Sequence, residues 1–362
     1  LYQINHGLEW SGLNHPIGWG LYITNFVFWI GIAHAGTLVS AILYLTRAPF
    51  RNSLSRIAEI ITVTAIITAA VFPFIHLGRA LYAFWVFPFP NQRDLWINFK
   101  SPLIWDAFAI GSYLIVSTMY LFLGLIPDFA STRDASTGKR KVLFRSLALG
   151  FNGSHHQWIH HSKTYLGIAA LVTPLVISVH SIVSWDFAVS TMPGWHSTIF
   201  APYFVIGAIF SGCAMILLIV IPLRSYINGI KAIIPIDDLG SMAKLMIACS
   251  IFLSLCYFHE IFFAFYSGSQ FEITVFKNRI LGEYKTLFIL IILLNCVLPL
   301  FSLKPSIRNS SKALYIISIG ICAGMWLERY LIIVGSLSTS NSAFSRDTYR
   351  LEWGEIWISL GG

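Results

Sequence analysis

The chain is poor in charged residues. Only 11% of its 362 residues are Asp, Glu, Lys or Arg, whereas 56% are hydrophobic and the mean hydropathy is +0.71. Soluble globular domains carry roughly 25% charged residues, and disordered chains hold few large apolar side chains. The composition therefore excludes both classes and predicts an integral membrane protein.

Cysteine is also scarce, and its positions follow no metal-binding pattern. All five residues fall inside apolar stretches, and none forms a Cys-x-x-Cys pair: Cys213, Cys249, Cys256, Cys296 and Cys322. Structural zinc sites and iron–sulfur clusters need clustered ligands of this kind. We therefore expect these cysteines to be small core side chains, and the sequence supports neither kind of centre.

Long apolar stretches are what the chain has in abundance. A helix rises about 1.5 Å per residue, so roughly 20 residues cross about 30 Å of hydrocarbon. Eight stretches reach that length: residues 17–45, 57–82, 102–126, 165–188, 199–223, 239–267, 284–303 and 313–337. The predicted fold is an all-α polytopic membrane protein, residues 1–362, built as two four-helix bundles. We expect these bundles at residues 17–188 and 199–337. We also expect one further, truncated helix at each end of the chain, and at the C-terminal end an outer segment, residues 338–362, leads into it.

The net charge of +8 is unevenly distributed over the connections between these stretches. The first, third, fifth and seventh connections hold most of the basic residues, as is typical of the cytoplasmic side of a membrane protein. Their basic residues are Arg47, Arg51, Arg56, Arg133, Lys139, Arg140, Lys141, Arg145, Lys163, Arg224, Lys231, Lys304, Arg308 and Lys312. The pattern places the N-terminus outside and argues for a lipid bilayer, not nucleic acid, as the partner of the positive charge.

Ionisable residues inside the apolar stretches mark a candidate site, because charge in hydrocarbon is costly and is usually functional. With the predicted topology most of them lie in the outer half: His76, Arg79, Asp106, His180, Asp186, His259, Glu260, Glu328 and Arg329. His76 and Arg79 are three residues apart and are expected on one helix face. Each residue alone also fits a structural role, such as a cap, and Glu328 with Arg329 fits half of an interhelical ion pair.

As a set, these residues suit two-proton, two-electron exchange with a lipid-soluble quinol. A buried His and a buried carboxylate can accept the protons of its two hydroxyls, which makes His76, Asp106 and Asp186 the candidate catalytic residues. Arg79 or Arg329 would keep a carboxylate ionised. The remaining candidates for quinol binding are His180, Trp105 and Trp85, although both tryptophans also fit an interfacial aromatic belt.

Other polar residues suit a proton path less specifically. His34 is expected alone in the inner half, where it could join Glu59 in such a path, and Glu260 and Glu328 could extend it in the outer half. Ordinary hydrogen bonds between helices are the interpretation that we favour for His34 and Glu59. The histidines of residues 155–161 would offer i, i+4 metal ligands on a helix, but a solvated loop fits them better.

Several longer motifs resemble the NrfD/PsrC-type quinone-interacting membrane subunits, most closely the ActC subunit of bacterial alternative complex III. The similarity extends from about residue 18 to residue 358. The motifs are Gly-Ile-Ala-His-Ala-Gly-Thr at 31–37, Phe-Pro-Phe-Ile-His-Leu-Gly-Arg at 72–79, Asn-Phe-Lys-Ser-Pro-Leu-Ile-Trp-Asp at 98–106, Pro-Gly-Trp-His-Ser-Thr-Ile-Phe-Ala-Pro-Tyr-Phe at 193–204 and Gly-Met-Trp-Leu-Glu-Arg-Tyr at 324–330.

The resemblance implies a subunit of a quinol:acceptor oxidoreductase in the bacterial inner membrane, with no haem or iron–sulfur cluster of its own. It would oxidise menaquinol near the periplasmic face, release protons outward, and contribute to proton translocation. Its implied partners are c-type cytochrome subunits, a periplasmic iron–sulfur/molybdopterin-like subunit and a second NrfD-like membrane subunit. The family's pocket residues match His76, Asp106, Asp186 and Arg329.

Four alternatives stay open, the last of them a purely structural anchor, which would not need a deep His and a deep Asp. The first is a quinone-reducing membrane anchor of a molybdopterin oxidoreductase of the polysulfide-reductase type. The second is a haem b anchor with His76 and His180 as axial ligands, against which the single inner-half His34 argues. The third is a proton-coupled transporter, which usually has charges at the bilayer midplane.

Overall fold

The computed structural model describes residues 6–45, 51–87, 90, 93–227, 229–339 and 349–361, and every regular element in them is a helix. Eight helices are long and apolar enough to cross a membrane, which confirms the all-α polytopic prediction. They are α2 (Leu21–Leu45), α3 (Arg51–His76), α4 (Pro102–Asp134), α6 (His155–Ala188), α7 (Phe200–Tyr226), α9 (Ile236–Tyr266), α11 (Lys285–Ile292) with η2 (Leu293–Val297) and η3 (Leu298–Leu303), and α13 (Ser311–Tyr330) with η4 (Leu331–Gly335) and α14 (Ser336–Ser338).

Shorter helices lie in the connections and near the ends. They are η1 (Ala80–Val86), α5 (Gly138–Leu147), α8 (Ile230–Ile233), α10 (Gln270–Leu281), α12 (Pro305–Arg308) and α15 (Trp353–Gly361). Helix α15 lies against α2, where Asn25 donates to Ser359 at 2.7 Å. Four of the five cysteines are buried and Cys296 is partly buried, in agreement with their predicted core role.

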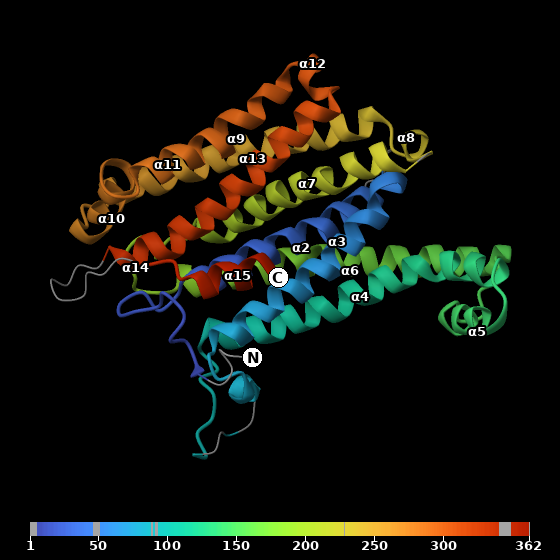
Figure 1. The fold of residues 1–362 in the computed structure, drawn as a ribbon, viewed down its shortest axis with the longest axis horizontal. Coiled ribbons are helices and arrows are strands. Elements are labelled where there is room, and N and C mark those ends of the chain that lie inside the picture. Colours follow the sequence, from blue (N-terminus) through green and yellow to red (C-terminus); the bar gives the residue numbers. More distant parts are fainter. Residues whose placement is uncertain are drawn as a thin grey trace.

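The long helices pack in two groups that meet along α2 and α7 (Figure 1). Helices α2, α3, α4 and α6 form the first group, and α7, α9, the α11–η3 helix and α13 form the second. Helix α2 is central, since 89% of the residues in its most apolar 18-residue stretch are buried, whereas the value for α4 is 33%. At the seam Gly212 of α7 approaches α2 so closely that a Cβ atom there would overlap Ala35.

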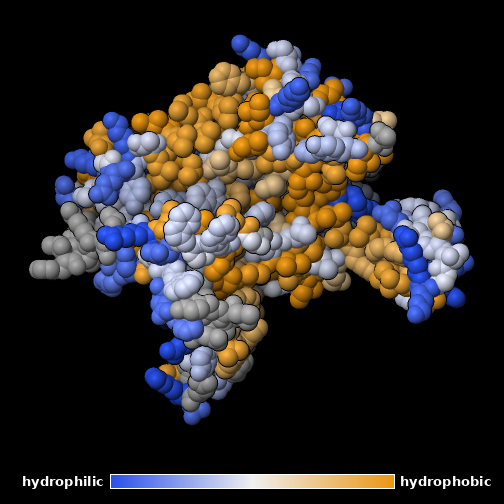
Figure 2. Space-filling view, viewed as in Figure 1, coloured by the Kyte–Doolittle hydropathy of each residue, from blue (hydrophilic) through white to orange (hydrophobic). Residues whose placement is uncertain are grey.

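Basic residues gather where α3 begins and where α4 and α7 end. Arg56 of α3, Arg133 of α4, Arg224 of α7 and Arg308 of α12 lie at this end of the helices, which we call the cationic face. Figure 1 shows α5, α8 and α12 at the same end. Helices α4 and α6 extend past their neighbours here and carry α5, which forms a projecting lobe with a largely hydrophilic tip (Figure 2). The rings of Phe129 and Phe144 hold α5 to α4, with centroids 6.0 Å apart.

Four predicted helix boundaries were wrong by six residues or more, namely both ends of α3, the end of α4 and the start of α6. Helix α3 ends at His76 and not at Tyr82, because Gly78 adopts a left-handed φ of 66° that a regular helix does not contain. Helix α6 begins at His155, so the histidine run is helical and not a loop. Ser154 caps this helix by accepting a hydrogen bond from the Gln157 amide at 3.4 Å, which is the side-chain role that favours a helix start.

Candidate functional site

Two carboxyl groups meet at the end of the first helix group opposite the cationic face. Asp106 lies in the second turn of α4 and Asp186 in the last turn of α6, and their side chains are within hydrogen-bonding reach of each other. Asp106 is only 6% exposed, and the Oδ1 atom of each residue is buried without a hydrogen-bond partner. Two buried carboxylates this close would repel each other, so one of the two groups holds a proton and the pair can exchange it.

A tryptophan precedes each of these aspartates. The rings of Trp105 and Trp185 meet edge to face, with centroids 6.2 Å apart and planes at 82°. Trp105 also donates its indole N–H to the carbonyl oxygen of Phe99 at 2.8 Å. Both rings are more than a third exposed, so they form an aromatic wall beside the acid pair on the lipid-facing surface. The sequence interpretation missed Trp185, although the repeated Trp-Asp dipeptide was visible.

His76 and Arg79 are not brought together as predicted. His76 is the last residue of α3, and its Nδ1 atom is buried without a hydrogen-bond partner. Arg79 follows the turn at Gly78 and is exposed, so the two residues do not share a helix face. Within the described residues, no ion pair joins Arg79 to either aspartate.

Trp85 belongs to a separate aromatic cluster in η1. Its ring lies 4.9 Å from that of Tyr82 and 6.4 Å from that of Phe84, and it is 38% exposed. Pro88 and Phe89, which follow this cluster in the sequence, lie outside the described residues. Trp85 therefore stays a candidate only by its position at the same end of the molecule as the acid pair.

A buried histidine pair lies further along α2 and α6. The Nδ1 atoms of His34 and His180 are 2.9 Å apart, each residue is 1% exposed, and neither Nε2 atom has a partner. The ring of Tyr113 stacks on His34 at 4.5 Å. The sequence predicted the two histidines in different halves of the bilayer. This prediction was wrong, because α2 and α6 run antiparallel and bring the two side chains together in the interior of the first helix group. Polar groups are thus not confined to one end of the bundle.

Arg329 points to the same region from the second helix group. Its guanidinium lies 4.1 Å over the ring of Phe204, and that ring lies 6.0 Å from His180. The ion pair that the structure gives Arg329 is to its chain neighbour Glu328, with Nη1 and Oε1 3.1 Å apart. In the described part of the chain, no ion pair joins Arg329 to Asp106 or Asp186, and none joins Glu328 or Arg329 to a charged residue of another helix, so both predictions for these residues were wrong.

Glu260 and Glu328 form part of a second polar centre, inside the other helix group. Both are buried, and Glu328 accepts hydrogen bonds from the Tyr257 hydroxyl and from Asn295 Nδ2, the latter at 3.2 Å. Asn295 lies in η2, a π-helical turn of the kind that often occurs at functional sites. The single outer constellation predicted from the sequence is thus divided between the two helix groups.

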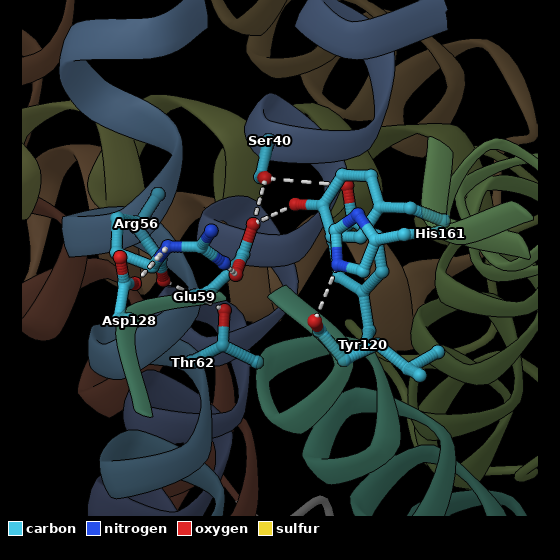
Figure 3. Close-up of polar contacts among 10 residues, drawn as sticks. Ser40, Arg56, Glu59, Thr62, Tyr120, Asp128 and His161 are labelled. Carbon is cyan, nitrogen blue, oxygen red and sulfur yellow. Dashed lines mark hydrogen bonds and ion pairs between the residues drawn. The ribbon is translucent and has the colours of Figure 1, made fainter. Parts of the chain in front are cut away.

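Glu59 lies near the cationic face in a network of its own (Figure 3). It is 2% exposed and accepts hydrogen bonds from Ser40 at 2.8 Å, from Arg56 at 3.0 Å and from the Tyr165 hydroxyl. Nearby, the Nε2 atoms of His156 and His160 are 3.0 Å apart on the exposed start of α6. In the described part of the chain, no three His, Cys, Asp or Glu residues gather as a metal site would require.

Comparison with known proteins gives consistent matches. The family model described as "Polysulphide reductase, NrfD" matches residues 10–341. A Halobacterium salinarum protein, named as a putative membrane subunit of dimethyl sulfoxide reductase, is 27% identical over 60% of the chain and 46% of its own length. A selenate reductase subunit from Mesobacillus selenatarsenatis is 23% identical over 78% of the chain and 65% of its own length.

A third relative is an archaeal protein, the Hdr-like menaquinol oxidoreductase integral membrane subunit of Archaeoglobus fulgidus. It is 23% identical over 49% of the chain and 42% of its own length. In all three cases the chain spans less than two thirds of the relative's length.

Proposed function

The chain belongs to the NrfD family of polysulphide reductase, and from this membership we propose that it is the quinone-binding membrane subunit of an oxidoreductase complex. The Asp106–Asp186 pair is the observation that carries the proposal. It supplies two carboxyl groups in contact, beside exposed aromatic rings at the lipid surface, where a lipid-soluble ring can enter.

The chemistry follows from the stoichiometry of quinol oxidation. A quinol that becomes a quinone gives up two protons and two electrons. Because one of the two carboxyl groups already holds a proton, the Asp106–Asp186 pair accepts one proton of the quinol, and His76 at the end of α3 accepts the other. The electrons pass to an iron–sulfur partner subunit on the same side of the membrane. Trp105 and Trp185 hold the ring at the entrance.

The relatives favour the type of complex named in the first alternative, a molybdopterin oxidoreductase, but with electrons flowing from quinol and not to quinone. Their names associate them with a dimethyl sulfoxide reductase and a selenate reductase, which suits a membrane anchor of a molybdopterin oxidoreductase better than alternative complex III. We therefore propose that type of complex, in the inner membrane of a bacterium, with quinol as the electron donor. The name of the Archaeoglobus fulgidus relative supports menaquinol as that donor.

The test is quinol-dependent electron transfer by the assembled complex with Asp106→Asn. This change keeps the shape of the side chain but removes its proton affinity. We expect at least a roughly hundredfold fall in kcat, the low end of the contribution of a positioned proton acceptor. The measurement is the initial rate of reduction of the partner's redox centre by added quinol.

Asp134→Asn is the matched control, because Asp134 lies at the other end of the same helix in an exposed ion pair with Arg133. It is expected to leave the rate within about twofold of wild type, since screened surface pairs contribute little. An assembled Asp106→Asn complex with an unchanged rate would place proton transfer elsewhere and would remove the carboxyl pair from the mechanism.

A further inference from the structure

We propose that helix α5 is an interfacial helix that binds the headgroups of anionic phospholipids on the cationic side of the bilayer. The proposal goes beyond the quinone chemistry and does not depend on it. It is carried by the charge of the segment that contains α5, by the level at which α5 is attached to α4, and by the exposure of every side chain of α5.

The segment between α4 and the apolar part of α6 has basic residues and no acidic ones. Residues 135–163 contain no Asp or Glu, and their basic residues are Lys139, Arg140, Lys141, Arg145 and Lys163. All of them are exposed, and within the described residues none forms an ion pair. The carboxylate that precedes them, Asp134, is already paired with Arg133 at 2.7 Å. Clusters of roughly four to eight basic residues beside a membrane-spanning helix are typical of sites for anionic lipids.

The attachment of α5 to α4 places it at the level of the headgroups. The ring of Phe144 packs on that of Phe129, with centroids 6.0 Å apart, and Phe129 lies three residues past Ile126, the end of the apolar stretch. Since a helix rises about 1.5 Å per residue, Phe129 lies about 4–5 Å beyond the hydrocarbon. The headgroup layer is about 5–8 Å thick on each side of a bilayer. Helix α5 therefore rests on this layer.

The rest of the described protein does little to stabilise α5. All 10 residues of this helix are described, and none of them is buried. Val142 and Leu143 are 66% and 57% exposed, although both are apolar. A helix shorter than about 12–15 residues is marginal in water, and one with basic and apolar side chains is stabilised at the surface of an anionic membrane. Such a surface offers apolar contact to Val142 and Leu143 and phosphate groups to their basic neighbours.

The position of α5 beside the bundle favours lipid as the occupant. Figure 1 shows α5 next to the ends of α4 and α6, on the side away from the second helix group. Figure 2 shows hydrophobic side chains continuing to the base of the lobe, where hydrophilic ones replace them. Lipid surrounds the bundle on this side, so headgroups reach α5 without the help of another subunit. An acidic protein is the alternative occupant, and the test below separates the two.

The test is hydrogen exchange of the amides of residues 139–149, measured by mass spectrometry on the intact complex in lipid nanodiscs. Nanodiscs of phosphatidylcholine alone are compared with nanodiscs of phosphatidylcholine and phosphatidylglycerol in equal parts. Each basic residue near an anionic surface strengthens binding by a factor of about five, so exchange is expected to be at least about tenfold slower in the anionic nanodiscs. Salt at about 1 M, which shortens the Debye length to about 3 Å, is expected to remove this difference.

A triple variant tests which basic residues are responsible. Lys139→Gln, Arg140→Gln and Lys141→Gln together are expected to abolish the slower exchange in anionic nanodiscs. The matched control combines three changes that remove the same charge from exposed positions of the cationic face outside α5: Lys231→Gln, Lys304→Gln and Lys312→Gln. It is expected to keep the full difference between the two lipids. Each variant is compared with itself in both lipids, so intrinsic differences in amide exchange cancel.

Equal exchange of α5 in the two lipids overturns the proposal. If that exchange is slow even in phosphatidylcholine alone, a protein subunit covers α5; if it is fast in both, nothing covers it. A difference that persists in the triple variant or at high salt also contradicts the assignment, because headgroup charge is then not its cause. If the triple variant does not assemble, the lipid and salt dependence of the wild type decides.

Discussion

Each ring of the His34–His180 pair has one nitrogen that faces the other ring and one nitrogen without a partner. The hydrogen-bonding capacity of the two rings is therefore only partly satisfied, and only while both histidines are present. Removal of one ring leaves a buried polar atom of the other unpaired, and such an atom costs about 1–3 kcal/mol. The two residues should behave as one energetic unit.

The single changes His34→Leu and His180→Leu are each expected to lower the free energy of unfolding by about 1–3 kcal/mol, and the double change by less than their sum. Reversible unfolding in detergent, followed by far-UV circular dichroism, measures this double-mutant cycle. Strict additivity would mean that the 2.9 Å contact contributes nothing to stability.

The residues of the acid pair show what the sequence can and cannot say at this scale. Asp106 and Asp186 were predicted near the same end because charge in an apolar stretch and helix direction are both visible in the sequence. Their contact was not predicted, because it depends on how α4 and α6 are rotated about their axes. The depth of His34 was misjudged for a similar reason, since helix tilt and the first helical residue fix it.

Helix boundaries are set by local chemistry that is independent of hydropathy. For seven of the eight spans, the apolar stretch predicted at least one end of the helix to within about three residues. Hydropathy has this power because about 20 apolar residues are needed to cross a bilayer. The extensions of α4 and α6 beyond the cationic face were missed, since their residues are polar and hydropathy carries no signal there. Ser154 before α6 was the signal that could have located the second of them.

Ser154→Ala tests the role of that cap. Loss of an N-cap side chain costs about 1 kcal/mol, so the first turn of α6 is expected to open more often. Hydrogen exchange of the amides at residues 155–158, measured by mass spectrometry, should become about fivefold faster, the rate factor that such a free energy gives. Ser162→Ala, on an exposed position within the same helix, should leave these amides unchanged.

The two helix groups meet most closely between α2 and α7, and α6 also packs against α7. Helices α2 and α7 approach at Gly212, where the backbone of one helix lies against Ala35 of the other. Small residues allow this approach, which increases van der Waals contact between helices that have no hydrophobic driving force inside a bilayer. The seam also keeps Arg329 and Phe204 of the second group facing His180 of the first.

Gly212→Ala is therefore expected to destabilise the whole protein by about 1–3 kcal/mol, the usual cost of overpacking. Gly111→Ala is the matched control on α4, because a Cβ there meets nothing within 4 Å and alanine is the better helix former. It should be neutral or slightly stabilising. Thermal unfolding in detergent compares the two, and equal midpoints would contradict the assignment of α2 and α7 as the seam.

The lobe made by α5 and the ends of α4 and α6 gives the molecule a practical advantage for imaging. A bundle of helices inside a detergent micelle has few features outside the micelle, so single particles in electron micrographs are hard to align. The lobe breaks this near-symmetric outline at one end (Figure 2). Because it is carried by two continuous helices of 33 and 34 residues, it can serve as a built-in fiducial marker for three-dimensional reconstruction.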